Sequence, residues 1–590
     1  MINSIRRFAL LSAFLLSAII GIAKYNAFGE EITNYIWPLS GSKEITSVMG
    51  EARANHPHGG IDISLFGKVG VVPIVSVGDG KLIRFRVSRV GYGKCLYIQM
   101  DDGSIAVYAH LDRFNERFEE MARNLQLASG HYQIDQLDQE GGPRVKKGEI
   151  IGYGGKSGTK SPHLHFEIRD KDNICRNPLT NGFPISDDIR PSIKAVMFAP
   201  LWPGGTVNGS ASIHTFQFLY RNGKPGLASP VEISGRVGLS LLATDRVKPK
   251  GREFLPYRIV LKEGENDLFE YRADSVDFAD KRVYLAQFDM VHRGAFRGTF
   301  LRLYNPYPCR LPFFPMNNQG FLDSLSEGKH NLEVQVFDAN ENSITANLPI
   351  AVHNPAGYIK QEGPAFEAAQ MPYTLADGGS FITPDGKFSM KAQEHGLFAP
   401  MTFSFQIESA SDTAELHVAG QCVRVSSQGP PLRKDVEVSM SYAKGESKPE
   451  SLGLYLFHDG RPEFLGNEID RQKNIIVGHT EEMGLFCLAR DLTPPDILRV
   501  MPADHAKIKS IHPKISFLAA DSGSGVTYED VTAQIDDRLI IIDFSHGKCT
   551  GAPHWNLNPG IHTLTIRARD RAHNETITKT TWSVSRKGEN

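Results

Sequence analysis

The sequence predicts a mainly β protein, with an N-terminal antiparallel β-sheet domain that carries a short helical insertion, followed by two or three β-sandwich (Ig-like) domains. Three observations predict this fold class. Short runs that alternate apolar and polar residues recur along the chain between turn residues. One N-terminal segment has helical periodicity instead. A turn-and-strand unit at 328–338 occurs again at 560–570.

The length and composition predict several ordinary globular domains. The chain has 590 residues, of which 41% are hydrophobic and 22% are charged, and a single hydrophobic core stops growing at about 250 to 300 residues. The formal net charge is −2, and there is no basic run or aromatic-studded basic stripe. We therefore expect three to five domains and no nucleic-acid partner.

The first residues have the order of a secretory signal peptide. Arg6 and Arg7 precede an apolar run over 8–23, and small residues follow at 27–29. The run is shorter than the ~20 residues that cross a bilayer. We therefore expect residues 1–29 to be cleaved rather than kept as an anchor, and no transmembrane span in the mature, exported chain.

Residues 30–186 carry the signals of the antiparallel sheet and its insertion. An aspartate-glycine turn at 101–103 separates two of the expected strands. Apolar residues recur at helical spacing from Phe114 and Gly130 follows, which predicts an amphipathic helix over about 114–128. The expected strands are 83–87, 96–100 and 105–110.

The rest of the chain is expected to form a β-sandwich domain at 187–355, a β-rich domain at 356–490 and an Ig-like β-sandwich domain at 491–590. Proline-bearing links at 188–191 and 491–495 are typical of domain boundaries.

The repeat predicts that two of these domains are built alike. Residues 328–338 match 560–570 position by position, and an asparagine follows four residues after each unit. His330 and His562 occupy equivalent places, which favours turn or strand packing over catalysis. The aspartate-glycine stretch at 521–525 is interpreted as a sandwich turn rather than a calcium loop, because it lacks spaced acidic ligands.

Six widely spaced cysteines indicate neither a dense disulfide scaffold nor a zinc module. We expect them to be buried or to form occasional bridges, and not to bind metal.

A loop at 58–62 offers a histidine and a carboxylate within one turn of chain. Its sequence, His58-Gly59-Gly60-Ile61-Asp62, disfavours a helix and allows a tight backbone, so that both side chains can point at one spot. Asp62 could instead bond to turn amides. Pro57 stiffens the chain between His56 and His58, so His56 is not expected to be a ligand.

A predicted strand at 163–168 offers two more histidines. Because side chains alternate along a strand, His163, His165 and Glu167 share one face while the apolar residues between them face the core. A half-exposed strand that happens to carry histidines would explain this pair alone. His110 ends another predicted strand of the same sheet. Because three separate segments then offer histidine, a metal or catalytic site is favoured over a chance pair. Glu167 is either a partner that orients an imidazole or a polar residue satisfied elsewhere.

Zinc suits these side chains. It takes histidine nitrogen and carboxylate oxygen at about 2.0–2.2 Å, and a catalytic site uses three protein ligands and a water. Four histidines and one aspartate exceed that need by two groups. A spare imidazole with a pKa near ~6.5 suits proton transfer at neutral pH.

The stretch from Trp37 to Arg169 resembles the lysostaphin and LytM-type zinc endopeptidases, metallopeptidase family twenty-three. Four motifs carry the resemblance: HxGxD at 58–62, a YAHL-like strand at 108–111, a glycine-rich hairpin at 145–152 and HLHFE at 163–167. Two departures are the helical insertion after Leu111 and Ser161, where glycine is frequent.

The resemblance implies one zinc ion held by His58, Asp62 and His165, with His110 and His163 as the catalytic imidazoles. It implies hydrolysis of peptide bonds in peptidoglycan stems or cross-links for cell-wall remodelling, in the periplasm or cell envelope of a Gram-negative bacterium or after secretion. Some relatives have lost metal ligands and act as regulators, but this sequence keeps every ligand.

Two other functions stay open on the sequence. One is a non-hydrolytic wall-binding or regulatory scaffold, and the other is an exported protease for protein substrates. The expected partners are peptidoglycan peptides and, through the C-terminal β domains, envelope proteins. The sequence does not say which imidazole takes the proton.

Overall fold

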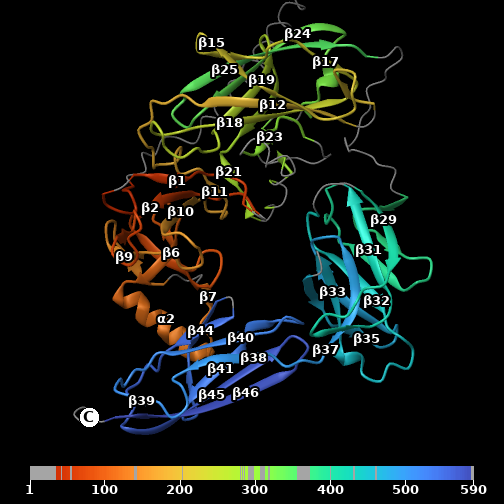
Figure 1. Ribbon diagram of the computed structural model, residues 1–590. Helices are drawn as coiled ribbons and strands as arrows, with labels where there is room; N and C mark the ends of the chain where they lie inside the picture. The colour runs from red at the N-terminus through yellow and green to blue at the C-terminus, as the bar shows by residue number, and fades with distance from the viewer. Residues whose placement is uncertain are drawn as a thin grey trace, which may run out of the picture.

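The computed structural model consists mostly of antiparallel β-sheets, coloured from red to blue along the chain in Figure 1. The structure describes residues 35–585 with gaps at 42, 54–55, 138–141, 202–203, 279–280, 282–283, 285, 290–297, 306–312, 316–318, 355–371, 399, 429–431, 459–460 and 546. The predicted signal peptide at 1–29 lies outside the described residues. Within those described residues, no helix has the length and apolar character needed to cross a membrane.

The first sheet places the strand with the two histidines between the other two pieces of the predicted site. The strand β10 pairs with β2 on one side and with β6 on the other, both antiparallel. The predicted strands at 83–87, 96–100 and 105–110 lie within β4, β5 and β6. In sheet order the strands are β1 (Ile45–Ser47), β2 (Ile61–Ser64), β10 (His163–Arg169), β6 (Ile105–Phe114), β5 (Lys94–Met100), β4 (Gly80–Val87) and β7 (Ile134–Leu137).

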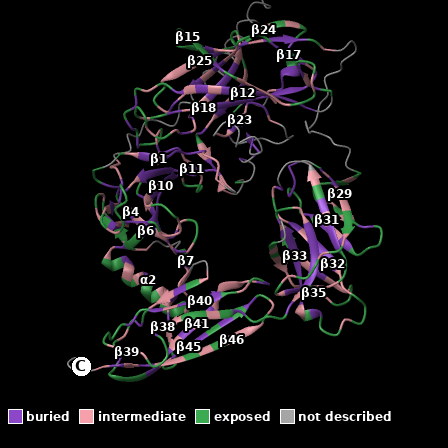
Figure 2. Ribbon diagram, viewed as in Figure 1, coloured by how far each residue is buried: buried purple, intermediate pink, exposed green. Residues whose placement is uncertain are grey.

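The predicted insertion is helix α2, Glu116–Ser129. It begins two residues later than expected because Phe114 still belongs to β6 and Asn115 is the N-cap, accepting a hydrogen bond from the Phe118 amide at 2.9 Å. Gly130 ends the helix with φ 75°. Phe118 is buried in the core of the first sheet, while Figure 2 shows most of α2 in the colours of exposed and intermediate residues.

A segment from further along the chain completes the first sheet. Strand β11 (Cys175–Arg176) pairs with β10 and also with β21 (Ser275–Val276). Phe278 follows β21, and its ring centroid lies 6.0 Å from that of His56. The predicted boundary at 186/187 stays a prediction, and residues beyond it border the loop that carries His58.

Residues 192–352 form two sheets with a common core. One is centred on β12 (Ser192–Pro200) and β18 (Val237–Thr244), and the other on β19 (Arg258–Glu263), β24 (Gly328–Phe337) and β25 (Ser343–Val352). Buried apolar residues alternate with more exposed ones along β24, as expected for a strand that covers a core with one face.

The β-rich region whose fold the sequence left unassigned is a second pair of sheets, and with the pair at the C-terminal end the described residues contain three β-sandwiches. Its core lies between a sheet with β31 (Cys422–Gln428), β33 (Leu452–His458) and β37 (Leu485–Asp491) and one with β28 (Phe388–Ala392), β32 (Val436–Ser441) and β36 (Ile475–Thr480). A disulfide joins Cys422 to Cys487. Cys95, Cys175 and Cys549 are buried and unbridged, and Cys309 lies outside the described residues.

The last sandwich repeats features of the first one, as the sequence repeat predicts. Its main strands are β38 (Asp496–Met501), β40 (Ile515–Ala520) and β44 (Lys548–Gly551) in one sheet, and β41 (Val526–Ile535), β45 (Gly560–Asp570) and β46 (Glu575–Val584) in the other. His330 on β24 and His562 on β45 each bond a carboxylate through Nδ1 and a backbone carbonyl through Nε2. Both histidines therefore have a structural role, because their hydrogen bonds hold the neighbouring turns.

The last sandwich packs against the first domain beside the helical insertion, where Figure 1 shows β40 and β44 next to α2. Arg89 donates from Nε to Asp543 Oδ1 at 3.0 Å and from Nη2 to the Ile542 carbonyl at 2.7 Å. The rings of His131 and Tyr528 lie 6.5 Å apart, edge to face. The C-terminal sandwich thus contacts the N-terminal domain.

Candidate metal centre

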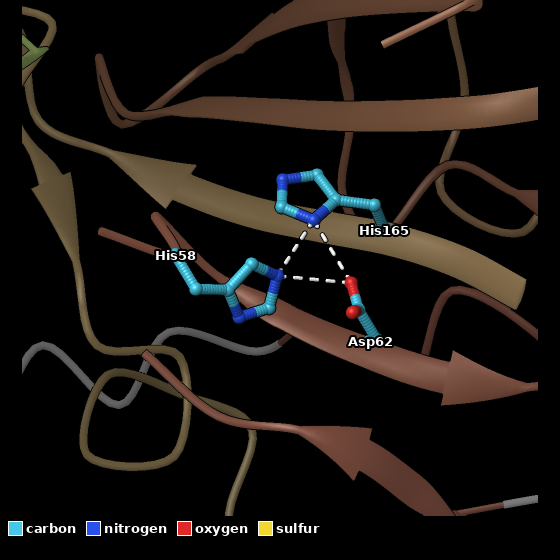
Figure 3. Close-up of side chains that lie close together, drawn as sticks. All are labelled: His58, Asp62 and His165. Atoms are coloured by element: carbon cyan, nitrogen blue, oxygen red, sulfur yellow. Dashed lines mark hydrogen bonds and ion pairs between the residues drawn. The ribbon is translucent and has the colours of Figure 1, made fainter. Parts of the chain in front are cut away.

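Three of the predicted site residues converge on one point (Figure 3). Asp62 on β2 is the cross-strand partner of His165 on β10, and His58 enters from the preceding loop. His58 Nε2 lies 2.9 Å from Asp62 Oδ1 and 2.9 Å from His165 Nδ1. His165 Nδ1 lies 3.0 Å from Asp62 Oδ1. The three atoms form a nearly equilateral triangle.

Two glycines let the loop approach β10 this closely. A Cβ on Gly60 would stand 2.1 Å from the Phe166 carbonyl oxygen, and one on Gly59 would stand 2.7 Å from the ring of Phe278. A larger residue at 60 would push the loop away from the strand backbone, whereas one at 59 would have to displace the ring of Phe278, so Gly60 is the stricter steric requirement.

The orientation of His58 is fixed by the backbone behind it. Its Nδ1 lies 2.8 Å from the Val48 carbonyl oxygen and 3.2 Å from Ser47 Oγ. A carbonyl only accepts, so Nδ1 carries the hydrogen. In the neutral imidazole, Nε2 therefore presents a lone pair to the centre of the triangle.

His165 is oriented in the same way by a buried carboxylate. Its Nε2 lies 2.8 Å from Glu167 Oε1, and Glu167 is 0% exposed. Glu167 in turn accepts from Arg169 Nε at 2.7 Å and from the Tyr92 hydroxyl at 2.6 Å. Because the proton sits on Nε2, His165 turns the lone pair of Nδ1 toward Asp62 and His58.

The donor set fits a cation. Arg53 Nη2 donates to Asp62 Oδ2 at 3.2 Å, which leaves Oδ1 pointing at the two imidazoles. Two nitrogen lone pairs and a carboxylate oxygen within 3.0 Å of one another repel unless a positive charge lies among them. His58, Asp62 and His165 are all buried, so water screens this repulsion weakly.

The pKa values respond to the same crowding. Burial raises the pKa of Asp62, but the neighbouring imidazoles outweigh it and hold that pKa well below its usual value. Burial lowers the pKa of His165, yet the carboxylates of Asp62 and Glu167 raise it to about 9. Burial would raise the pKa of Glu167, but the Arg169 charge and the His165 bond lower it strongly. The shifts of Asp62 and His165 both reflect the close approach of the carboxylates and the imidazoles.

A β-bulge places His110 beside this triangle. Two residues of β6, Ala109 and His110, stand opposite Cys95 alone on β5, and His110 has a φ of 61°, a conformation that non-glycine residues adopt rarely and often at functional sites. Its Nδ1 lies 2.8 Å from the Ser157 carbonyl oxygen. Its Nε2 is therefore the free nitrogen of the neutral ring.

His163 completes the group. Its Nδ1 lies 2.8 Å from the Ser161 carbonyl oxygen, and its Nε2 lies 3.5 Å from Asp62 Oδ1. The rings of His110 and His163 are 4.6 Å apart. Burial and the neighbouring imidazoles lower the pKa of His110 to about 3, and burial lowers that of His163. Both rings are therefore neutral near pH 7.

The structure brings all five predicted site residues together, while their roles stay predictions. Glu167 orients an imidazole, and His56 lies against Phe278 outside the triangle. Sequence reasoning missed Arg53, Tyr92 and Arg169. Arg169 continues the alternation of 163, 165 and 167, and that signal could have found it. The other two have no local signal, because they reach the site from separate segments.

No protein-family model matches the chain. A glycyl-glycine endopeptidase, ALE-1 of Staphylococcus capitis, is 25% identical over 234 residues, which cover 39% of this chain and 53% of the relative. The murein hydrolase activator NlpD of Escherichia coli K12 is 28% identical over 148 residues, 25% of this chain and 31% of the relative. The chain thus spans about half or less of these relatives.

A zinc-containing peptidase from Vibrio cholerae is 27% identical, covering 23% of this chain and 36% of that one, with a TM-score of 0.17. The four motifs and the sequence relatives support a first domain similar to the lysostaphin and LytM-type peptidases, metallopeptidase family twenty-three.

Proposed function

We propose that the first domain binds one zinc ion through His58, Asp62 and His165 and hydrolyses peptide bonds in the stems or cross-links of peptidoglycan, as part of an exported protein. One observation supports this proposal above the others. His58 Nε2, Asp62 Oδ1 and His165 Nδ1 lie 2.9–3.0 Å apart, with the other side of each ligand tied to a separate partner.

The composition of this donor set favours zinc over calcium or magnesium. Two imidazole nitrogens and one carboxylate oxygen are typical of catalytic zinc, whereas Ca²⁺ and Mg²⁺ prefer oxygen alone. Zinc bound there would supply Lewis-acid polarisation of a carbonyl and a water whose pKa is near ~7. Three protein ligands leave the fourth position of a tetrahedron to the reactants.

His110 and His163 supply the proton chemistry in this proposal. Each ring is held by an Nδ1–H bond to a carbonyl, from Ser157 and Ser161, which leaves the lone pair on Nε2 in the neutral ring, and His163 Nε2 lies 3.5 Å from Asp62 Oδ1. One Nε2 accepts a proton from water and passes it to the leaving amine, and the other ring, when protonated at Nε2, donates that hydrogen to the negatively charged oxygen that develops on the substrate carbonyl. Which ring has which role is left open.

Peptidoglycan is the substrate that the relatives' names support. One relative is named a glycyl-glycine endopeptidase and others are named murein hydrolase activators. An activator could work without cutting, which is the scaffold alternative. The complete ligand set and the fixed tautomers of His58 and His165 favour hydrolysis, because a scaffold has no need of either.

Digestion of purified peptidoglycan tests this function. The mature protein, loaded with one equivalent of zinc, should release muropeptides whose masses identify one type of cleaved peptide bond. A chelator or His165→Ala should abolish release. Casein should stay intact. Zinc-loaded protein that leaves the wall uncut, or that cuts casein but not the wall, would contradict the proposal.

A further inference from the structure

Each of the two repeated sandwiches gathers three aspartates at one end. In the first sandwich they are Asp187, Asp245 and Asp338, and all three are buried. One carboxylate oxygen from each lies within 4.8 Å of the others. The last sandwich has the same arrangement with Asp491, Asp521 and Asp570.

The six aspartates occupy equivalent places in the two folds. Asp187 and Asp491 stand where the chain enters each sandwich. Asp245 follows the last residue of β18, and Asp521 follows the last residue of β40. The third pair is Asp338, directly after β24, and Asp570, the last residue of β45.

An asparagine ties the entering chain to the third aspartate in both copies. Asn342 Nδ2 donates to the Asp187 carbonyl and to Asp338 Oδ2, each at 2.8 Å. Asn574 Nδ2 donates to the Asp491 carbonyl at 3.0 Å and to Asp570 Oδ2 at 2.7 Å. The same scaffold thus holds the carboxylates in both sandwiches.

One buried carboxylate oxygen in the first cluster has no partner. Asp245 is 8% exposed, and its Oδ1 is buried without a hydrogen bond. Asp187 and Asp245 line a small cavity with about 20 Å³ of free space, room for about one water-sized guest. In the second cluster, Asp521 Oδ2 is likewise buried without a hydrogen bond.

Among the described residues, no lysine, arginine or histidine forms an ion pair with any of the six aspartates. Burial, followed by the charge of Asp338, raises the pKa of Asp245 to about 7, and burial also raises the pKa of Asp187 and Asp338. Three buried carboxylates without a counter-charge are costly to desolvate.

We propose that each cluster binds one Ca²⁺ ion, with the unpartnered oxygens of Asp245 and Asp521 among the ligands. The donors are all oxygens, which excludes a zinc preference. Two oxygens bound to one Ca²⁺ at about 2.4 Å stand at most about 4.8 Å apart, and the carboxylate oxygens lie within that span. Mg²⁺, with bonds of about 2.0–2.1 Å, tolerates a smaller span.

The ions would stiffen the two junctions where the sandwiches begin. The first cavity is also lined by Ile45 and Met49 of the peptidase domain, so its ion would tie the entering chain, β18 and β24 together beside that domain. This revises the interpretation of 521–525 as a plain turn. Its missing acidic ligands come from Asp491 and Asp570, which local spacing could not reveal.

Counting bound Ca²⁺ on the whole mature protein tests the inference, with the zinc site filled by one equivalent of zinc. Equilibrium dialysis should find two Ca²⁺ per chain, with Kd on the order of 10⁻⁴–10⁻³ M as in extracellular modules. Asp245→Asn and Asp521→Asn should each bind one, and the double variant none. The exposed neighbours Asp188 and Asp496 provide matched controls, since their Asn variants should still bind two.

Thermal unfolding gives an independent readout. Saturating Ca²⁺ should raise the Tm of the wild-type protein by roughly 3–5 °C for the unit that unfolds first, and Mg²⁺ should raise it less. The double variant should not respond. A wild-type count of zero at 10 mM Ca²⁺, or a double variant that still binds two, overturns the proposal. The number of Ca²⁺ ions bound by the wild-type protein tests the proposal even if a variant fails to fold.

Discussion

Asp62 and His165 are direct partners on the antiparallel strands β2 and β10, and Asp62 Oδ1 lies 3.0 Å from His165 Nδ1. The sheet register itself therefore builds two corners of the triangle that these atoms form with His58 Nε2. A slip by one residue would turn His165 to the core face and replace it with Leu164 or Phe166. The buried apolar residues on the opposite face of β10 prevent that slip, so core packing fixes the ligand geometry.

Replacing His165 should remove the metal. His165→Ala deletes one of three ligands, so bound zinc should fall from one equivalent per chain to none, and wall hydrolysis should fall at least about 10³-fold. Metal analysis after dialysis and muropeptide release measure the two effects. His56→Ala is the matched control, because His56 stands two residues before His58 without joining the triangle, and it should keep both. A folded His165→Ala protein with full activity would refute the ligand assignment.

Replacing His110 should separate metal binding from turnover. Its Nδ1 is held by the Ser157 carbonyl and its ring lies beside that of His163, but no ring nitrogen belongs to the triangle. His110→Ala should therefore keep one zinc and lower kcat by about 10²–10⁴-fold, the usual worth of a proton-transfer group. His163→Ala should behave alike. Loss of zinc from either variant would show that the ring is a ligand instead.

The local pattern predicted the part of the site that lies on one strand or one loop. The alternation at 163–167 placed both histidines and Glu167 on one face, and the double glycine at 59–60 predicted the tight loop. The helix at 114–128 was correct to within two residues, since only the capping role of Asn115 was missing.

Long-range contacts could not be predicted in this way. The bulge at His110 depends on the pairing of β5 with β6, and the bond from Tyr92 to Glu167 joins residues 75 positions apart. The aspartate clusters also join distant segments, so the repeat at 328–338 and 560–570 revealed the scaffold but not the carboxylates that it gathers. Pairing across the sheets decides these contacts.

Glu167 should change the zinc affinity without being a ligand. Glu167→Gln keeps the shape but removes the charge that orients His165 and pairs with buried Arg169. Zinc affinity should fall about 10–100-fold, as measured by competition with a chromogenic chelator. The stability should fall by about 3–5 kcal/mol, because Arg169 is left as an uncompensated buried charge.

Two companion variants separate these effects. Tyr92→Phe removes the hydrogen bond to Glu167 and the one that the hydroxyl accepts from Arg169 Nη2, and should cost about 1–2 kcal/mol of stability, with a smaller loss of zinc affinity. Glu120→Gln on the exposed side of α2 should change neither quantity. If Glu167→Gln bound zinc as tightly as the wild-type protein, the carboxylate would have only a structural role.

Arg89 should hold the last sandwich against the first domain. Its side chain is 7% exposed, its guanidinium bonds Asp543 and the Ile542 carbonyl, and it lies over the ring of Tyr528 at 5.5 Å. Arg89→Lys keeps the charge but loses the planar fork that serves these partners together. The contact should weaken by about 1–2 kcal/mol, because Asp543 is partly exposed and water screens the pair.

Small-angle scattering of the mature protein measures the consequence. The radius of gyration of Arg89→Lys should increase as the last sandwich separates from α2, and the link at 491–495 should be cleaved faster by a protease. Arg86→Lys is the matched control, because Arg86 pairs with Asp135 inside the first domain at 3.7 Å, so its scattering should not change. Identical scattering from the wild-type protein and Arg89→Lys would mean that the contact does not depend on this side chain.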